Sequence, residues 1–136
     1  MDDDEIRRLA AFRLLLRQFE SFTEQAAQAC GLTSLQYQAL LAIKAHEADG
    51  AATVTALAQS LLVKHNSAVG LVDRMEQLGL VSRGHPEGDR RSVVVQLTPR
   101  GRRIVYQLAS QYRSELHRMA PEIGRNARRF AQAPEA

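Results

Sequence analysis

Residues 64–101 read KHNSAVGLVDRMEQLGLVSRGHPEGDRRSVVVQLTPRG, and their periodicity changes from helical to extended part-way along. Apolar residues at three-and-four spacing predict a helix from about His65 to Leu78, which Gly79 is placed to end. The inward positions of this helix are Ala68, Val69, Leu71, Val72 and Met75. Two runs rich in β-branched residues follow, at 80–83 and 92–97, around turn-forming residues 84–91. The stretch therefore predicts a helix followed by a β-hairpin with a charged tip.

Three further helices are predicted upstream. A long amphipathic helix runs from the acidic residues 2–5 to Cys30, and Gly31 follows as its stop. Thr33 and Gln36 form a capping-box pattern that starts a second helix, which extends to about His46. After an extended stretch at 52–54, Thr55 is the predicted cap of a short third helix. The apolar residues of this helix are Leu57, Ala58, Leu61 and Leu62.

Downstream of the hairpin, Thr98 and Pro99 supply a cap and a first-turn proline for a long fifth helix. Pro121 is expected to end or restart this helix, which leaves a final amphipathic piece through Phe130. Repeats and low-complexity linkers do not occur in the sequence. The predicted fold is mainly α with a small β-wing, in one domain.

Length and charge narrow the class of protein. A chain of 136 residues suffices for one domain with its own core, and no apolar run approaches the length of a membrane span. The single Cys30 and the acidic start, which does not resemble a signal peptide, predict a cytoplasmic protein. Residues 1–63 carry a net charge of −3 and residues 64–136 a net charge of +6, with 16 arginines among the 18 cations. An anionic polymer is a plausible partner for the second half, although solvated surface arginines would give the same composition.

The order helix, short helix, helix, charged hairpin is that of a winged helix-turn-helix, a DNA-binding unit whose second helix enters the major groove. Polar side chains begin that helix, and donors at a helix amino terminus suit base edges and phosphates. They are Lys64, His65, Asn66 and Ser67. Asn66 or Ser67 would alternatively cap the helix and contact no base.

The hairpin also carries a family resemblance. Asp89, Arg91, Val95, Leu97, Thr98 and Gly101 have the spacing of the wing signature of MarR-type transcriptional regulators. Residues 31–41, with Gly31-Leu32-Thr33, Gln36-Tyr37 and Leu40-Leu41, and residues 71–81 also resemble two helices of that family. The resemblance covers roughly residues 5–120, and three ordered blocks are unlikely to match by chance.

The resemblance implies a homodimer that binds double-stranded DNA at pseudo-palindromic operators and regulates transcription, as a repressor, in a bacterial or archaeal cytoplasm and on the nucleoid. Residues 1–30 and 99–136 would form the dimerisation layer, and residues 33–98 the winged helix-turn-helix. Two long terminal helices with apolar stripes agree with this, because so small a DNA-binding unit cannot cover both. The alternative is a winged-helix protein-interaction module that does not bind DNA.

Site residues follow from the same resemblance. Arg91 and its neighbour Arg90 would enter the minor groove from the wing tip. Asp89 would hold an arginine of the wing or of the recognition helix, such as Arg74, in a charge-assisted pair, as the matching residue does in the family. Arg74 and Arg83, like the cluster Arg100, Arg102 and Arg103, would contact phosphates or pair with Asp73, Glu76 or Glu87.

Enzymatic and metal-dependent readings find little support. The four histidines lie on four different predicted elements without metal-ligand spacing, and the sequence holds neither a phosphate-binding loop nor a nucleophile elbow. Cys30 lies at the end of the first helix and is interpreted as a small apolar residue, with a redox switch as the alternative. Peroxide-sensing members of the family carry their cysteine near the beginning of that helix. We therefore expect no enzymatic activity, no metal and no cofactor.

A small aromatic or anionic effector is the last expectation, because family members often bind such ligands between the dimerisation helices and the DNA-binding lobe. The residues expected to line this crevice are Phe12, Arg13, Leu16, Tyr37, Leu41, His46 and Tyr106. Plain packing of core and interface is the alternative for the same residues.

Overall fold

A computed structural model describes residues 1–86, 88–89 and 91–132 of the chain. The elements in chain order are α1 (Asp3–Ala29), α2 (Ser34–His46), the 3-10 turn η1 (Glu47–Asp49), β1 (Ala52–Thr53), α3 (Val54–Leu61), α4 (His65–Gln77), β2 (Val81–Gly84), β3 (Val94–Leu97) and α5 (Pro99–Ala131). The mainly helical fold with a small β-wing is thereby confirmed.

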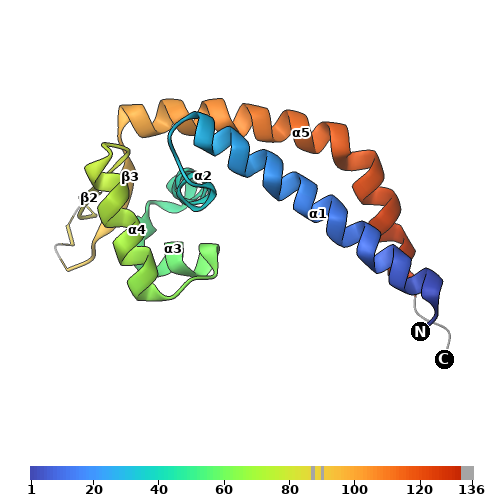
Figure 1. Cartoon of the computed structure of the whole chain (residues 1–136). Helices are drawn as coiled ribbons and strands as arrows, with labels where there is room; N and C mark the ends of the chain where they lie inside the picture. The colour runs from blue at the N-terminus through green and yellow to red at the C-terminus, as the bar shows by residue number, and fades with distance from the viewer. Residues whose placement is uncertain (87, 90, 133–136) are drawn as a thin grey trace.

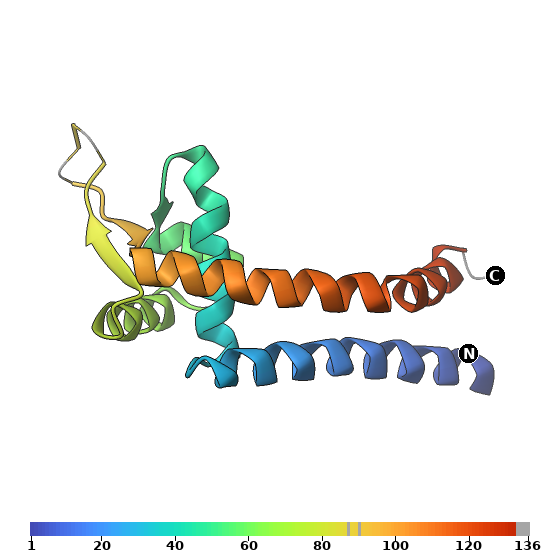
Figure 2. The ribbon, with the colours of Figure 1, turned by 90° about the horizontal axis from the view of Figure 1, so that it is seen from above.

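The molecule has two parts, which Figures 1 and 2 show from two directions. Residues 32–98 form a lobe that holds α2, α3, α4 and the small sheet. The helices α1 and α5 run side by side and extend away from the lobe; we call this pair the arm. Because α5 begins directly after β3, one continuous helix connects the wing to the far end of the arm.

Local sequence signals explain where the helices begin. The side chain of Thr33 accepts a hydrogen bond from the backbone of Gln36, whose own side chain accepts one from Thr33, so the predicted capping box is present. Asp2 and Glu5 form a second capping box at the start of α1. Thr98 caps α5, and Pro99 occupies its first turn, where a missing amide is harmless.

The core lies between α2, the sheet and the inner faces of α3, α4 and α5. Its largest fully buried side chains are Tyr37, Leu40, Ile43, Leu57, Met75, Leu80 and Leu108. In the sheet, β3 is central and pairs antiparallel with both β1 and β2, with Val95 opposite Ala52 on one side and Arg83 on the other. The short β1 pairing fixes the beginning of α3 against the hairpin.

Three details differ from the sequence predictions. The cap of α3 is Thr53, since β1 pairing places its hydroxyl, rather than that of Thr55, at the amide of Ala56. Leu62, predicted as an apolar residue of this helix, instead follows α3 in the left-handed conformation (φ 56°) and is 92% exposed. Pro121 neither ends nor restarts α5, which stays one helix and bends toward its C-terminal end (Figures 1 and 2), with Met119 buried before the proline and Phe130 beside Phe12 after it.

Candidate nucleic-acid interface

The first turn of α4 is exposed and its side chains are not used to cap the helix. Lys64 is the residue at the N-cap position, and no side chain there accepts a capping hydrogen bond. Lys64, His65, Asn66 and Ser67 are all exposed. The capping role considered for Asn66 and Ser67 is therefore wrong, which leaves their polar groups directed to solvent. Figure 1 shows this end of α4 and the hairpin on the same side of the lobe, away from α5.

Grooves flank α4 on both sides. Between α4 and the hairpin, His65 and Arg83 border a groove of about 390 Å³ together with Thr55 and Ser92. On the other flank, Arg74 borders a groove of about 490 Å³ beside the α1–α2 turn. The predicted set of cations is thus distributed on both sides of α4 rather than gathered at one point.

Arg83 connects the wing to the acidic side chains of α4. Its guanidinium contacts Asp73 Oδ1 at 2.5 Å and Glu76 Oε1 at 2.9 Å, and its backbone amide donates to Glu76 Oε2 at 3.2 Å. This realises the pairing that the sequence left open for Arg83. The contact neutralises two carboxylates that would otherwise repel phosphates, and it fixes β2 against α4.

Asp89 stabilises the wing loop by a different contact from the one expected. Its carboxylate accepts hydrogen bonds at 2.9 Å from the backbone amide of Arg91 and from the hydroxyl of Ser92. These bonds hold the pKa of Asp89 below its usual value. Among the described residues Asp89 makes no ion pair with Arg74, which lies on the flank of α4 beside the α1–α2 turn. Arg91 is exposed, and Arg90 lies outside the described residues.

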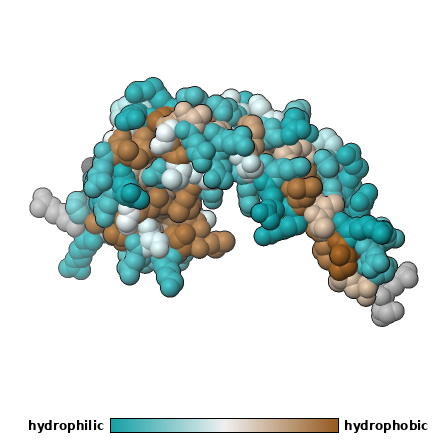
Figure 3. All heavy atoms as spheres, in the orientation of Figure 1, coloured by the Kyte–Doolittle hydropathy of each residue, from teal (hydrophilic) through white to brown (hydrophobic). Residues whose placement is uncertain are grey.

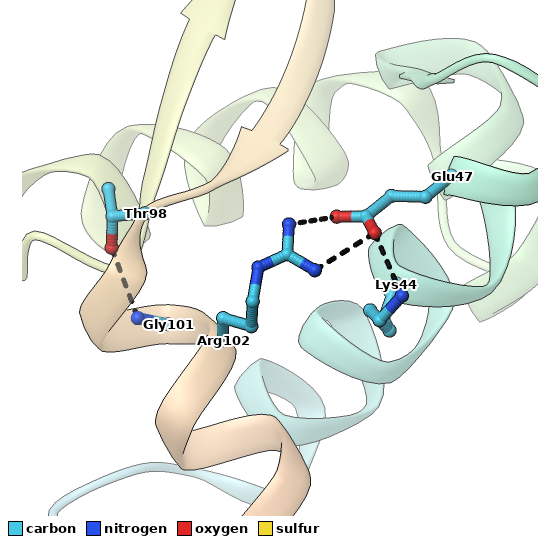
Figure 4. Close-up of polar contacts among 5 residues, drawn as sticks. All are labelled: Lys44, Glu47, Thr98, Gly101 and Arg102. Carbon is cyan, nitrogen blue, oxygen red and sulfur yellow. Dashed lines mark hydrogen bonds and ion pairs between the residues drawn. The ribbon is translucent and has the colours of Figure 1, made fainter.

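Thr98 and Gly101 join the wing to α5 (Figure 4). The Thr98 hydroxyl donates to the carbonyl of Gly79 at 2.6 Å and accepts from the amide of Gly101 at 3.1 Å. The Thr98 amide donates to the carbonyl of Leu80 at 3.0 Å. A Cβ atom on Gly101 would lie 2.0 Å from that same carbonyl oxygen, so only glycine permits this close contact. The Thr and Gly of the wing signature thus have a structural role.

An ion cluster that the sequence did not reveal lies beside the start of α5 (Figure 4). Arg102 of α5 binds both carboxylate oxygens of Glu47, at 2.7 and 3.1 Å, and Lys44 binds the same carboxylate at 2.9 Å. The Arg102 guanidinium, with Lys44 as the second partner, lowers the pKa of Glu47 to about 2. A separation of 55 residues between Glu47 and Arg102 left no local signal for this pair.

A cleft of about 580 Å³ opens between α1, α2, α3 and α5. Its walls include Phe19, Tyr37, Leu41, His46 and Tyr112. The ring of Tyr112 contacts Phe19 edge-on at a centroid distance of 4.7 Å and lies 6.0 Å from Tyr37. The buried Tyr37 hydroxyl has no hydrogen-bond partner among the described residues, and burial raises its pKa to about 12. His46 bonds Ser60 at 3.2 Å and links α2 to α3.

The lining of this cleft differs in part from the predicted crevice. Tyr37, Leu41 and His46 belong to it, whereas Phe12, Arg13, Leu16 and Tyr106 do not. Phe12 packs against Phe130 further along the arm, and Leu16 is 37% exposed there. Tyr106 is 57% exposed and lies under the Lys44 ammonium, 5.8 Å from its ring centre. The amphipathic pattern of α1 alone could not tell which turns reach the lobe.

Within the described part of the chain, no group of three or more His, Cys, Asp or Glu side chains is placed to hold a metal ion. Cys30 is half-buried at the end of α1 and packs against the core. None of the described helices is long and apolar enough to cross a membrane.

Comparison with known proteins places these features in a family context. Residues 31–92 match the sequence profile described as the MarR family. An uncharacterised HTH-type transcriptional regulator of Bacillus subtilis, YfiV, is 39% identical over 69 residues, which cover 51% of this chain and 41% of that protein. The transcriptional activatory protein BadR of Rhodopseudomonas palustris is 36% identical over 85 residues, which cover 62% of this chain and 49% of BadR. The chain therefore spans about half the length of these curated relatives.

Solved structures share the fold over a larger part of the chain. AbsC, a MarR family transcriptional regulator from Streptomyces coelicolor, superposes with a TM-score of 0.74 at 24% identity and covers 87% of this chain and 79% of its own. The MepR–DNA complex of Staphylococcus aureus superposes with a TM-score of 0.70 at 21% identity and covers 83% of this chain and 81% of its own. The arrangement of lobe and arm is thus one that is found in solved structures.

Proposed function

We propose that this chain is a member of the MarR family and acts as a homodimeric, sequence-specific, DNA-binding transcriptional regulator. It is a regulator rather than an enzyme, and it works in the cytoplasm on the chromosome, where operator binding represses transcription. Residues 33–98 contact the DNA, and residues 1–30 and 99–136 hold the two copies together.

The exposed first turn of α4 carries this proposal. Neither Asn66 nor Ser67 caps α4 with its side chain, and Lys64 precedes them. The wing extends on the same side of the lobe. In the major groove, such short polar side chains reach base edges, while Lys64 neutralises phosphates and Arg91 enters the adjacent minor groove from the wing. Exposed hydrogen-bonding side chains can contact base edges, and the cations beside them can bind the phosphates of a DNA duplex.

The proposal is tested by selecting duplexes from a random-sequence library on the wild-type protein and titrating the selected duplex by fluorescence anisotropy. Arg91→Ala should weaken binding about tenfold and reduce the salt slope by about one. Asn66→Ala should cost roughly 1 to 3 kcal/mol and relax the preference at one base pair. Arg113→Ala removes an exposed arginine of α5 and serves as the charge-matched control. A wild-type protein that enriches no sequence would show the proposal to be wrong.

Exposed apolar side chains on the arm support the homodimer. Leu9 and Leu16 are seven residues apart on one face of α1 and are 45% and 37% exposed, while Ile6 and Phe130 are 52% and 42% exposed. Figure 3 shows apolar surface toward the free end of the arm. A second copy would cover this stripe and space two α4 helices about 34 Å apart, one turn of duplex.

Sedimentation velocity tests the dimer. The double variant Leu9→Glu/Leu16→Glu should sediment as a monomer and lose tight binding to the selected duplex, because four carboxylates would be buried in each dimer. Leu35→Glu, at an equally exposed leucine of α2, is the control and should remain dimeric. A double variant that stays dimeric would place the interface elsewhere.

The cleft beside Tyr37 is the proposed effector site. Three aromatic rings line it, and its lining residues include no lysine or arginine among those described, which favours a neutral aromatic ligand over an anionic one. Phenol should raise the melting temperature more than benzoate at equal concentration, and Leu41→Trp, which fills the cleft, should abolish the phenol effect. Equal shifts in the wild type and the Leu41→Trp variant would exclude this cleft.

A further inference from the structure

Gly70 lies at the centre of the face of α4 that points away from the protein. The buried residues Ala68, Leu71, Val72 and Met75 define the inner face of this helix. At 100° per residue, Asn66, Gly70, Asp73 and Gln77 lie on the opposite side, and all four are exposed. Gly70 therefore occupies the middle of the surface that α4 presents to a partner.

Neither of the usual reasons for a glycine holds at this position. Gly70 is not among the glycines with positive φ, which are Gly31, Gly50, Gly79 and Gly88, so its backbone suits any residue. A Cβ atom on Gly70 would meet nothing within 4 Å, in contrast to Gly101. Glycine is the poorest residue of a helix interior after proline. Gly70 therefore lowers the stability of α4, and no contact within the described part of the chain requires a glycine there.

The neighbours of Gly70 leave the outer face of α4 shallow. Asn66, one turn before, has a short side chain, and Asp73, almost one turn after, is held by Arg83 at 2.5 Å. A helix with its side chains is about 10 to 12 Å across, and the major groove is about 12 Å wide, so a single Cβ atom decides how deeply the helix enters. Short side chains such as Asn66 and Ser67 reach base edges only from a deeply placed helix.

We propose that Gly70 is the point at which the base pairs approach the backbone of α4 most closely, and that its missing side chain determines operator selectivity. This inference rests on the proposed DNA-binding function and adds a specificity-determining position to it. The glycine lets α4 sink into the groove, and this depth brings Asn66 and Ser67 into contact with the bases. The phosphate contacts of the flanking cations are separate from this effect.

The test compares Gly70→Ala and Gly70→Leu with the wild-type protein on the duplex selected by the wild type and on a scrambled duplex of equal length. Both residues favour helices, so both variants should melt a few degrees above the wild type. Binding to the selected duplex should fall at least about tenfold for Gly70→Ala and further for Gly70→Leu. Binding to the scrambled duplex at low salt should stay within threefold, because phosphate contacts dominate it.

Gly124→Ala is the matched control, since it adds the same methyl group to a helical glycine of α5, where a Cβ meets only the end of the Arg128 side chain. Because residues 99–136 are assigned to the dimer, sedimentation velocity should first show that Gly124→Ala remains dimeric, and this variant should then bind both duplexes as the wild type does. A wild-type protein that selects its duplex and a Gly70→Ala variant that binds it within threefold would overturn this inference alone. A wild-type protein that selects no duplex would overturn the proposed function and this inference with it.

Discussion

Replacing Gly101 by alanine would place a methyl group 2.0 Å from the carbonyl oxygen of Leu80, whereas ordinary contacts begin near 3.4 Å. The obstacle is backbone, so no rotamer change can relieve it. The first turn of α5 would have to move by more than 1 Å from the chain that enters β2. The hydrogen bonds between the start of α5 and the chain before β2 would then be lost.

The cost can be worked out from those contacts. Separation breaks the bonds from Thr98 to Gly79 and Leu80, and the bond of 2.8 Å from Arg100 to the carbonyl of Leu78. Three hydrogen bonds at about 0.5 to 1.5 kcal/mol each, with about 1 to 3 kcal/mol for displaced packing, outweigh the gain of about 1 kcal/mol in helix propensity. We expect a net loss of about 2 to 5 kcal/mol in the free energy of unfolding.

Urea unfolding followed by circular dichroism, at one fixed protein concentration, measures this loss. Gly124→Ala in the same helix is the control, and it should be as stable as the wild type or more stable, because only a flexible side chain meets its methyl group. A Gly101→Ala protein whose free energy of unfolding lies within 1 kcal/mol of the wild-type value would refute this expectation, since the contact between Gly101 and Leu80 would then tolerate a Cβ atom.

Two further predictions concern single polar groups. Glu47→Gln should destabilise the protein by about 1 to 2 kcal/mol at pH 7. Folding lowers the pKa of Glu47 from its ordinary 4.5 to about 2, so the stability that its carboxylate contributes is complete above pH 4.5 and is lost as the pH falls toward 2. Urea unfolding should therefore show the free energies of unfolding of the two proteins converging over that range. A difference that persists at pH 2 would contradict the ion pair. Tyr37→Phe should leave the protein equally stable or raise the free energy of unfolding by about 1 kcal/mol, since it removes a buried hydroxyl without a partner among the described residues. A loss above 1 kcal/mol would reveal a partner for that hydroxyl.

Signals carried by neighbouring residues were readable from the sequence. The capping box of Thr33 and Gln36, and the Thr98-Pro99 start of α5, set helix boundaries through contacts within four residues, and the structure confirms them. The prediction that Pro121 ends or restarts α5 was wrong, because the effect of a proline on a helix depends on the contacts that the residues after it make. A proline removes one helical hydrogen bond, and the contact of Phe130 with Phe12 holds the helix together across that loss.

Contacts between distant segments were not readable in the same way. The pairing of β1 with β3 moved the cap of α3 from Thr55 to Thr53, and a strand of two residues leaves almost no pattern in the sequence. Asp89 was assigned to an arginine by resemblance, whereas its two bonds within three residues form a local turn. The helix that begins at about His65 followed from apolar periodicity, but the absence of a capping role for Asn66 required the structure.

The unbroken course of α5 limits how this protein can evolve. Val105 and Leu108 are buried against the lobe, and Met119 is buried further along the same helix, within the arm. An inserted residue between Leu108 and Met119 would rotate one set against the other by about 100° and shift it by about 1.5 Å. Substitutions in this segment preserve that phase, whereas single insertions and deletions destroy it. Relatives of this chain should therefore vary at exposed positions of α5 but keep the number of residues between Leu108 and Met119.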